Sequence, residues 1–370
     1  MKSSGIALVM TLLLLVVLVV LVGQFSYTTK IDAYIADNTN NEIQIRYGLL
    51  SGVNFAIAQL QLDAMKEEGS KTKYDCTTDE WAQSLWPPDK PQKIGNVLVF
   101  YSIQDESAKF NLLRLIWKKK EAEEKKKEDK DKEGQEGEEG QKKEEEQDKE
   151  QDKGKDKDKP KEKPKAISPE QQFDLLGKII QGEKAAFDPA KLRESIVAWM
   201  KQKKGKSEKT TGSFPTKVPM FSMKELSMAG IMPYSFLSGR LDEKGNRIKG
   251  FSEYTTIWSD GDINVNTASV ELLQSLSPKM NAELIKGIIS YREQAGPDGE
   301  RQVFKQKTDL KKVQGLSDGI YSEIESLVDV RSSYFLIEAM ATAGRSKKKL
   351  SVVVYREGKK VYKLWSDYTN

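Results

Sequence analysis

The chain begins with MKSSG at residues 1–5 and continues with IALVMTLLLLVVLVVLV at residues 6–22. Within this second segment of 17 residues, Thr11 is the one polar side chain. A helix of this length spans about 26 Å, close to the roughly 30 Å hydrocarbon core of a bilayer. A threonine hydroxyl can bond to a carbonyl of the preceding turn, so Thr11 does not interrupt the helix. The stretch predicts a transmembrane helix, which we assign to residues 6–23.

Processing of this N-terminus has two interpretations. In the first, residues 1–23 are a cleaved secretory signal peptide or a generic signal anchor. Signal peptides have a shorter apolar core and a small-x-small cleavage site, and Leu21-Val22-Gly23 is a weak site. In the second, the cut falls between Gly5 and Ile6. A very short basic leader, a glycine and an unbroken apolar helix resemble the class III signal of type IV pilins and pseudopilins.

The pilin resemblance implies a leader peptide at residues 1–5. A prepilin peptidase would cleave after Gly5 and methylate the new amine of Ile6. Lys2 and the terminal amine flank the short side of the helix, and the positive-inside bias keeps such a flank in the cytoplasm. We therefore expect a single pass through the inner membrane, with the bulk of the chain in the periplasm.

The fifth mature position, counted from Ile6, is Met10. Most members of the pilin family carry a glutamate there, which is thought to pair with the terminal amine of the subunit ahead. A carboxylate inside a membrane is costly without such a partner. A neutral Met10 therefore suits a tip or initiating subunit, and a plain apolar membrane residue is the alternative explanation.

An apolar stripe follows the membrane segment, with spacings of 3 or 4 residues, as on one face of a helix. Gly52 lies inside it and lowers the local helix propensity. The pattern predicts that residues 24–65 continue the helix and lay one face on a sheet, although an ordinary amphipathic helix has the same periodicity. The stripe consists of Ile45, Leu49, Val53, Ala56 and Leu60.

Strand patterns lie on both sides of the central part of the chain. Residues 95–103 read GNVLVFYSI, rich in β-branched and aromatic side chains. Residues 334–341, 350–355 and 360–365 have the same character, and Gly358 stands in the turn between the last two. One sheet formed from both ends of the chain explains this order better than two separate sheets.

The first strand leads into Asp105-Glu106-Ser107-Ala108-Lys109-Phe110-Asn111-Leu112. This run resembles the DE-x-G-K-(I/F)-N-L segment of minor pseudopilin K, a family of the general secretion pathway. The resemblance implies a structural role for Asp105, Glu106, Lys109 and Asn111. The glycine of the family pattern is Ala108 here.

Residues 118–165 consist almost entirely of Lys, Glu, Asp, Gln and Gly. Such a segment buries too little apolar surface to offset its ordering entropy, so we predict a disordered insert. Its opposite charges nearly cancel, which argues against a nucleic-acid-binding arm of one sign.

The stretch from Asp262 to Leu310 has the most specific pattern. It reads INVNTA, then LLQSL, then an apolar helix ending in Tyr291-Arg292. This order resembles the helix-hairpin-helix-like half of pseudopilin K. We interpret Asn264, Asn266 and Thr267 as turn and cap residues for the following helix.

These patterns give an α+β fold class. A long N-terminal transmembrane pilin helix packs on a small antiparallel sheet, and a large all-α domain with a helix-hairpin-helix-like unit is inserted. The expected parts are a leader at 1–5, a transmembrane helix at 6–23, its periplasmic continuation at 24–65, a strand region at 66–117, the charged insert at 118–165, the helical domain at 166–330 and C-terminal strands at 331–370.

The pseudopilin resemblance implies a function in assembly. The chain would be a minor pseudopilin of a type II secretion system that caps the tip and helps to initiate the pseudopilus. Its partners would be other minor pseudopilins, the prepilin peptidase and the inner membrane, without nucleic acid.

The residue inventory argues against an enzyme. The chain has no histidine, and Cys76 is its single cysteine, which excludes His-assisted nucleophiles and an intrachain disulfide. Cys76 is either buried and inert or paired between chains. Adjacent carboxylates such as Asp105 and Glu106 point to opposite faces of a strand. We expect no cofactor and no metal. Calcium remains possible, but lysines follow Trp199 where the family often has an acidic pair.

The alternative function is DNA binding by a membrane-anchored helix-hairpin-helix protein of the competence type. Such hairpins present backbone N–H groups of small glycines to a phosphate. The first hairpin, residues 276–281, has no glycine and contains Pro278, which lacks an N–H. The second, residues 313–317, keeps Gly315. The sequence therefore favours the assembly function.

Overall fold

The computed structural model describes residues 2–70, 72–84, 86–117, 166–181, 187–206, 219–295, 301–344 and 346–369. The charged insert predicted at 118–165 lies outside the described residues. The chain divides into two compact units. The first contains Met1–Lys71, Thr77–Asp105 and Ser333–Asn370, and the second contains Thr72–Cys76 and Glu106–Ser332.

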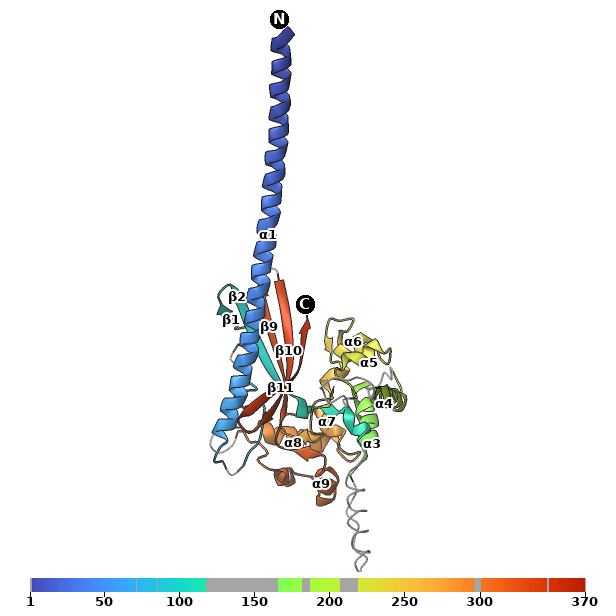
Figure 1. Ribbon diagram of the computed structural model, residues 1–370. Coiled ribbons are helices and arrows are strands. Elements are labelled where there is room, and N and C mark those ends of the chain that lie inside the picture. Colours follow the sequence, from blue (N-terminus) through green and yellow to red (C-terminus); the bar gives the residue numbers. More distant parts are fainter. Residues whose placement is uncertain are drawn as a thin grey trace, which may run out of the picture. The chain divides into compact units, whose positions relative to one another are not determined.

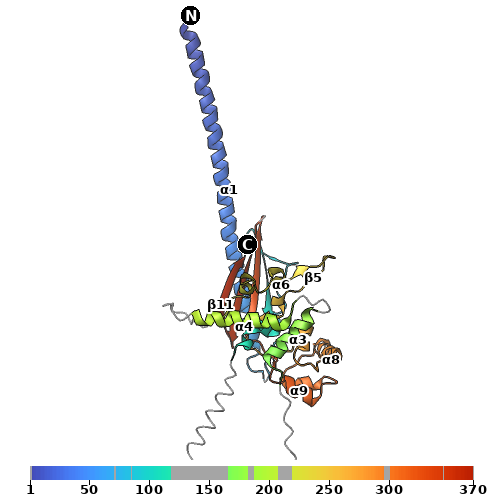
Figure 2. The same ribbon diagram turned by 90° about the vertical axis from the view of Figure 1, so that its right-hand side faces the viewer.

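The first unit is built around one helix, α1 (Lys2–Lys66). The hydroxyl of Thr11 donates to the carbonyl of Leu8 at 2.8 Å, so this threonine sits inside the helix as expected. Only the C-terminal part of α1 contacts the sheet, and the N-terminal part extends away from it in both views (Figures 1 and 2). The prediction that the apolar N-terminal helix continues into a sheet-packing helix is confirmed.

The sheet of the first unit combines strands from both ends of the chain. Its order is β1-β2-β9-β10-β11, and all neighbours are antiparallel. The C-terminal strands are longer than the sequence indicated, and the short β1 was not expected. The bounds are β1 (Gln92–Ile94), β2 (Val97–Asp105), β9 (Tyr334–Ala343), β10 (Ser346–Glu357) and β11 (Lys360–Thr369).

The predicted apolar stripe of α1 forms the core between helix and sheet. All five residues, from Ile45 to Leu60, are buried. Gly48 and Gly52 lie between them, and a Cβ at Gly48 would stand 2.9 Å from Val99 Cγ2. A Cβ at Gly52 would stand 3.1 Å from the other methyl of Val99 and 3.3 Å from Ala339 Cβ. These glycines let the helix approach the sheet more closely than any side chain would allow.

Polar contacts fix the helix along the sheet. The Arg356 guanidinium donates to Asp63 at 2.8 Å, and both side chains are buried or nearly so. The hydroxyl of Tyr101 donates to the Gln59 amide oxygen. Moving the end of α1 would separate Arg356 from Asp63 and leave an uncompensated buried charge. This ion pair therefore helps to fix the position of the helix end.

The second unit consists mainly of short helices, joined by three two-stranded strand pairs that the sequence did not indicate. The helical segments are η1 (Glu106–Ala108), η2 (Leu112–Leu115), α3 (Pro169–Gln181), α4 (Pro189–Lys206), α5 (Lys224–Met228), α6 (Tyr234–Ser238), η4 (Phe251–Glu253), α7 (Val270–Gln274), α8 (Ala282–Glu293), η5 (Lys307–Lys312) and α9 (Asp318–Ile324). The strand pairs are β3 (Phe110–Asn111) with β6 (Thr255–Thr256), β4 (Arg240–Leu241) with β5 (Arg247–Ile248), and β7 (Ile263–Asn264) with β8 (Val328–Asp329).

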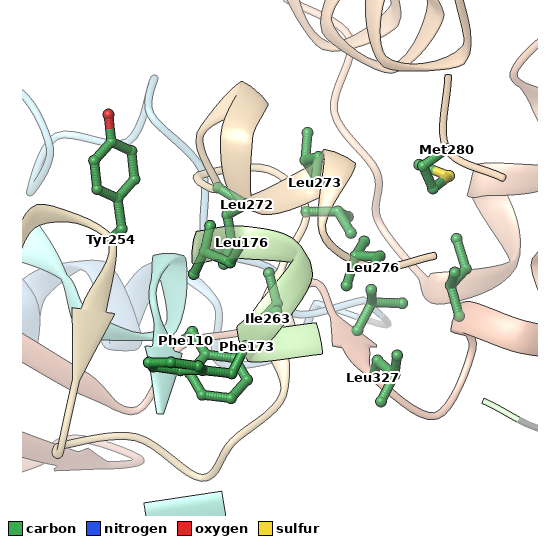
Figure 3. Packing of buried hydrophobic residues seen from close by; sticks show 14 of the residues in the cluster. Phe110, Phe173, Leu176, Tyr254, Ile263, Leu272, Leu273, Leu276, Met280 and Leu327 are labelled. Atoms are coloured by element: carbon green, nitrogen blue, oxygen red, sulfur yellow. The ribbon is translucent and has the colours of Figure 1, made fainter. Parts of the chain in front are cut away.

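One apolar core joins the parts of the second unit. Figure 3 shows Phe110 of β3 against Phe173 of α3, with ring centroids 5.9 Å apart. Ile263 of β7 and Leu272 of α7 belong to the same core. Residues 106–117, which the sequence-based division grouped with the strand region, therefore pack in this unit.

The close approach of α1 to the sheet gives a testable prediction. Gly48→Leu should destabilise the first unit by about 1–3 kcal/mol, because an added side chain overpacks a filled interface. The full chain in detergent would be unfolded in guanidinium and followed by tryptophan fluorescence. Gly23→Leu is the matched control, since a Cβ at Gly23 meets nothing within 4 Å. Equal midpoints for the two variants would contradict the packing argument.

Candidate functional site

The N-terminal part of α1 is the largest apolar surface of the described residues. Ile6 is 65% exposed and Met10 is 69% exposed, and the side chains from Leu12 to Val22 are similarly open. This helix is long and apolar enough to cross a membrane, and the described part of the chain contains one such helix. A cluster of exposed apolar side chains of this size marks a membrane or partner surface.

The residues predicted for processing lie at the far end of this surface. A Cβ at Gly5 would meet nothing within 4 Å, and Ile6 follows it on the same continuous helix. Met10 faces outward one turn later. All three predicted positions are therefore open to an external partner rather than packed in the chain's own core.

The Asp105-to-Asn111 motif divides between the units. Asp105 ends β2 in the first unit, while Glu106, Lys109 and Asn111 belong to the second. Lys109 Nζ lies 2.6 Å from a Glu106 oxygen, and the Thr256 hydroxyl donates to the other oxygen. The pair is almost completely buried. Its geometry satisfies both charged groups internally and leaves no open acid or base for catalysis.

Asn111 connects two segments that are far apart in the sequence. Its amide donates to the Ser259 carbonyl at 2.6 Å, and its oxygen accepts the Leu113 N–H at 2.9 Å. These contacts join the end of β3 and the start of η2 to the segment that follows β6. The role of Asn111 in this geometry is a buried structural bridge.

Asn264 and Asn266 have similar bridging positions. The Asn264 amide donates to the Asp75 carbonyl at 3.0 Å and to the Ser332 hydroxyl at 2.8 Å. The Asn266 side chain exchanges two 3.0 Å hydrogen bonds with the backbone of Phe304, as a paired strand residue would. Both side chains are completely or nearly completely buried.

The expected cap role of this motif needs a correction. The N-cap of α7 is Ser269, whose hydroxyl accepts the Leu272 N–H at 3.3 Å. Asn264 does form the expected turn, because its oxygen accepts the Asn266 N–H at 2.9 Å. Thr267 makes a longer, 3.4 Å contact with the Asn264 carbonyl. The side chains of Asn264 and Asn266 therefore bond to residues far away in the sequence and do not cap the following helix.

The two helical hairpins of this unit have different loops. The first joins α7 to α8 through residues 275–281, and Asn281 caps α8 by accepting the Leu284 N–H at 2.9 Å. The second joins η5 to α9 and contains Gly315, whose φ is 88°. A Cβ at Gly315 would stand 3.2 Å from Leu284 Cδ2, so this glycine faces the neighbouring helix α8.

The carboxylate of Glu323 in α9 contacts the loop of the first hairpin. Ser277 Oγ donates to Glu323 Oε2 at 2.9 Å, and Lys279 Nζ is paired with Glu323 Oε1. The hydrogen bond from Lys279 holds the pKa of Glu323 below its usual range, with a smaller contribution from Ser277. No local sequence signal points to Glu323, because it lies 46 residues from Ser277.

Comparison with known proteins fits this architecture. Residues 259–329 match the helix-hairpin-helix motif family. A chain of the crystal structure of the GspK–GspI–GspJ complex from the type 2 secretion system of enterotoxigenic Escherichia coli superposes with a TM-score of 0.53. The match covers 90% of this chain and 99% of that chain, at 13% sequence identity. The chain has a GspK-like pseudopilin fold.

The similarity concerns the fold, because only about one aligned residue in eight is identical. Among curated proteins, no sequence matches significantly. The architecture predicted from the sequence, a pilin helix on an antiparallel sheet with an inserted helical domain that contains a helix-hairpin-helix-like unit, is confirmed.

Proposed function

We propose that this chain is a minor pseudopilin of a type II secretion system, which caps the tip of the pseudopilus and helps to initiate it. The observation that carries this proposal is the division of α1. Its C-terminal stripe is buried on the sheet, while its apolar segment from Ile6 to Val22 is exposed. A folded unit that leaves such a helix open needs a lipid or a helical partner.

The proposed partners are the counterparts of the proteins that accompany GspK in the crystallised complex, GspI and GspJ. Their apolar helices would pack with α1 in the inner membrane after the prepilin peptidase removes residues 1–5 and methylates Ile6. Inside a bilayer an apolar side chain gains no hydrophobic free energy by leaving lipid for another helix. Association would therefore depend on close van der Waals contacts between the helices.

Two features support a place at the tip. Met10 is neutral, so α1 carries no membrane carboxylate that requires the amine of a subunit ahead. The second unit also adds a large group of helices to the chain. In a filament that repeats one subunit, every copy would need room for such a group, whereas a single subunit at the tip would not. We propose a non-enzymatic role, in which the buried Glu106–Lys109 pair serves the fold.

Cysteine cross-linking tests the proposed helix contacts. Cys76 is the single cysteine and is buried, so introduced cysteines give a clean signal. Cysteines placed singly at Leu12, Leu13, Leu14 and Leu15 sample one full turn of α1. In membranes that also contain the other minor pseudopilins, each with one cysteine in its apolar helix, we expect cross-links at one or two neighbouring faces of this turn.

The control is Met228→Cys, at a side chain of the second unit that is 86% exposed. It should not cross-link to a cysteine in the partner's membrane helix. Absence of cross-links at all four leucine positions, with the partners present, would contradict the proposed assembly.

The tip position gives a separate prediction for Met10→Glu. A membrane carboxylate without an amine ahead of it costs a few kcal/mol, so this variant should reduce the recovered complex about tenfold or more. Met10→Leu should leave recovery unchanged. The measurement is quantitative co-purification with the other minor pseudopilins from detergent extracts. Equal or greater recovery for Met10→Glu would place a subunit ahead of this chain and contradict the tip assignment.

A further inference from the structure

We propose that residues 37–41 form a hinge in α1, between its apolar segment and the part that packs on the sheet. In the structure these residues continue the helix. Their sequence is DNTNN. Asp, Asn and Thr are poor helix formers, because their short polar side chains compete with the helix for backbone hydrogen bonds or lose rotamer freedom in it. A run of five such residues therefore weakens the helix at this point.

Most side chains of the proposed hinge face solvent. Those from Asp37 to Asn40 are exposed, and Asn41 is half-buried. Contact with the sheet follows directly, because Lys348 Nζ of β10 lies 2.5 Å from a Glu42 oxygen. Ile45, three residues later, begins the buried stripe. The hinge therefore lies directly before the part of α1 that the sheet holds in place.

The parts of α1 on either side of the hinge have support that the hinge lacks. The apolar segment would lie in lipid, where a broken backbone hydrogen bond finds no water, so the helix stays intact there. The C-terminal part contains Gly48 and Gly52, but the core that it forms with the sheet stabilises it. Between these parts the helix depends on its own propensity, and short unsupported helices are marginal in water.

Residues 25–29, which read FSYTT, also have low helix propensity. They directly follow the apolar segment, and the aromatic rings of Phe25 and Tyr27 suit the membrane interface. Farther along α1, the Thr39 hydroxyl donates to the Ile35 carbonyl at 2.8 Å, and such bonds often bend a helix. The hinge is therefore assigned to the run that contains Thr39.

A hinge at this place lets the folded first unit change its angle to the membrane while the apolar segment keeps its own contacts. This use rests on the proposed function, in which the chain passes from a single subunit in the membrane into an assembly with other subunits. The hinge itself is a property of α1 alone. Its test needs no partner protein, so a negative result would leave the proposed function standing.

The test measures distances between two spin labels by double electron–electron resonance, on the full chain in detergent with Cys76→Ser. Labels at Thr29 and Tyr47 form the hinge-spanning pair, and labels at Tyr47 and Met65 form the control pair in the packed part. All three positions are exposed. Both pairs lie 18 residues apart, which is five helical turns or about 27 Å, so each pair lies on one side of the helix.

The control pair should give one narrow distance distribution near about 27 Å. The hinge-spanning pair should show an additional population at shorter distances, because bending brings its ends together. The combined substitutions Asn38→Ala, Thr39→Ala and Asn40→Ala should reduce this population about tenfold or more, since alanine favours the helix at each position. Asn38→Gly, which favours the helix even less, should increase the population.

The control pair also verifies that each variant is folded, since its distance should stay the same in all of them. If the hinge-spanning pair of the wild type is as narrow as the control pair, α1 is rigid and the inference is wrong. A population at shorter distances that persists unchanged in the triple alanine variant would place the bend outside residues 37–41 and would also overturn the inference.

Discussion

The close packing of α1 on its sheet is the constraint on which the first unit depends. Gly48 and Gly52 allow the helix to lie against Val99 and Ala339, and the stripe from Ile45 to Leu60 fills the interface. Because this interface involves only the C-terminal part of α1, the same helix carries an exposed apolar segment away from the sheet. One continuous helix therefore has a C-terminal part buried on the sheet and an exposed apolar N-terminal part. In the proposed assembly function, the first part anchors the folded unit and the second part contacts lipid or partner helices.

The second unit depends on buried polar bridges between distant segments. Asn111, Asn264 and Asn266 each form hydrogen bonds with backbone groups that short strands and irregular loops leave unpaired. A buried backbone group without a hydrogen-bond partner would destabilise the fold. The Glu106–Lys109 pair and the Glu323 carboxylate have the same character. These asparagines and buried ion pairs therefore stabilise the structure of the unit.

Much of the fold could be predicted because it follows from local periodicity. The apolar run from Ile6, the stripe from Ile45 and the C-terminal stretch rich in β-branched residues each have a spacing of apolar side chains that predicts a helix or a strand. The paired strands β3–β6 and β7–β8 could not be predicted, since each is two residues long and joins distant segments. Gly52 lowers helix propensity when the sequence is considered alone, and the nearby side chains of Val99 and Ala339 on the sheet explain its presence. Glu323 had no signal, because its partners are 44 and 46 residues away.

The central claim is that the chain is cleaved between Gly5 and Ile6, so that the mature protein keeps the apolar segment of α1 as an assembly helix. Mass spectrometry of the N-terminus, on protein purified from membranes of cells that contain the prepilin peptidase, tests this claim most directly. The account predicts a chain that begins with N-methylated Ile6 and keeps the whole helix. A mature chain that begins after Gly23, or one that still carries Met1, would contradict it.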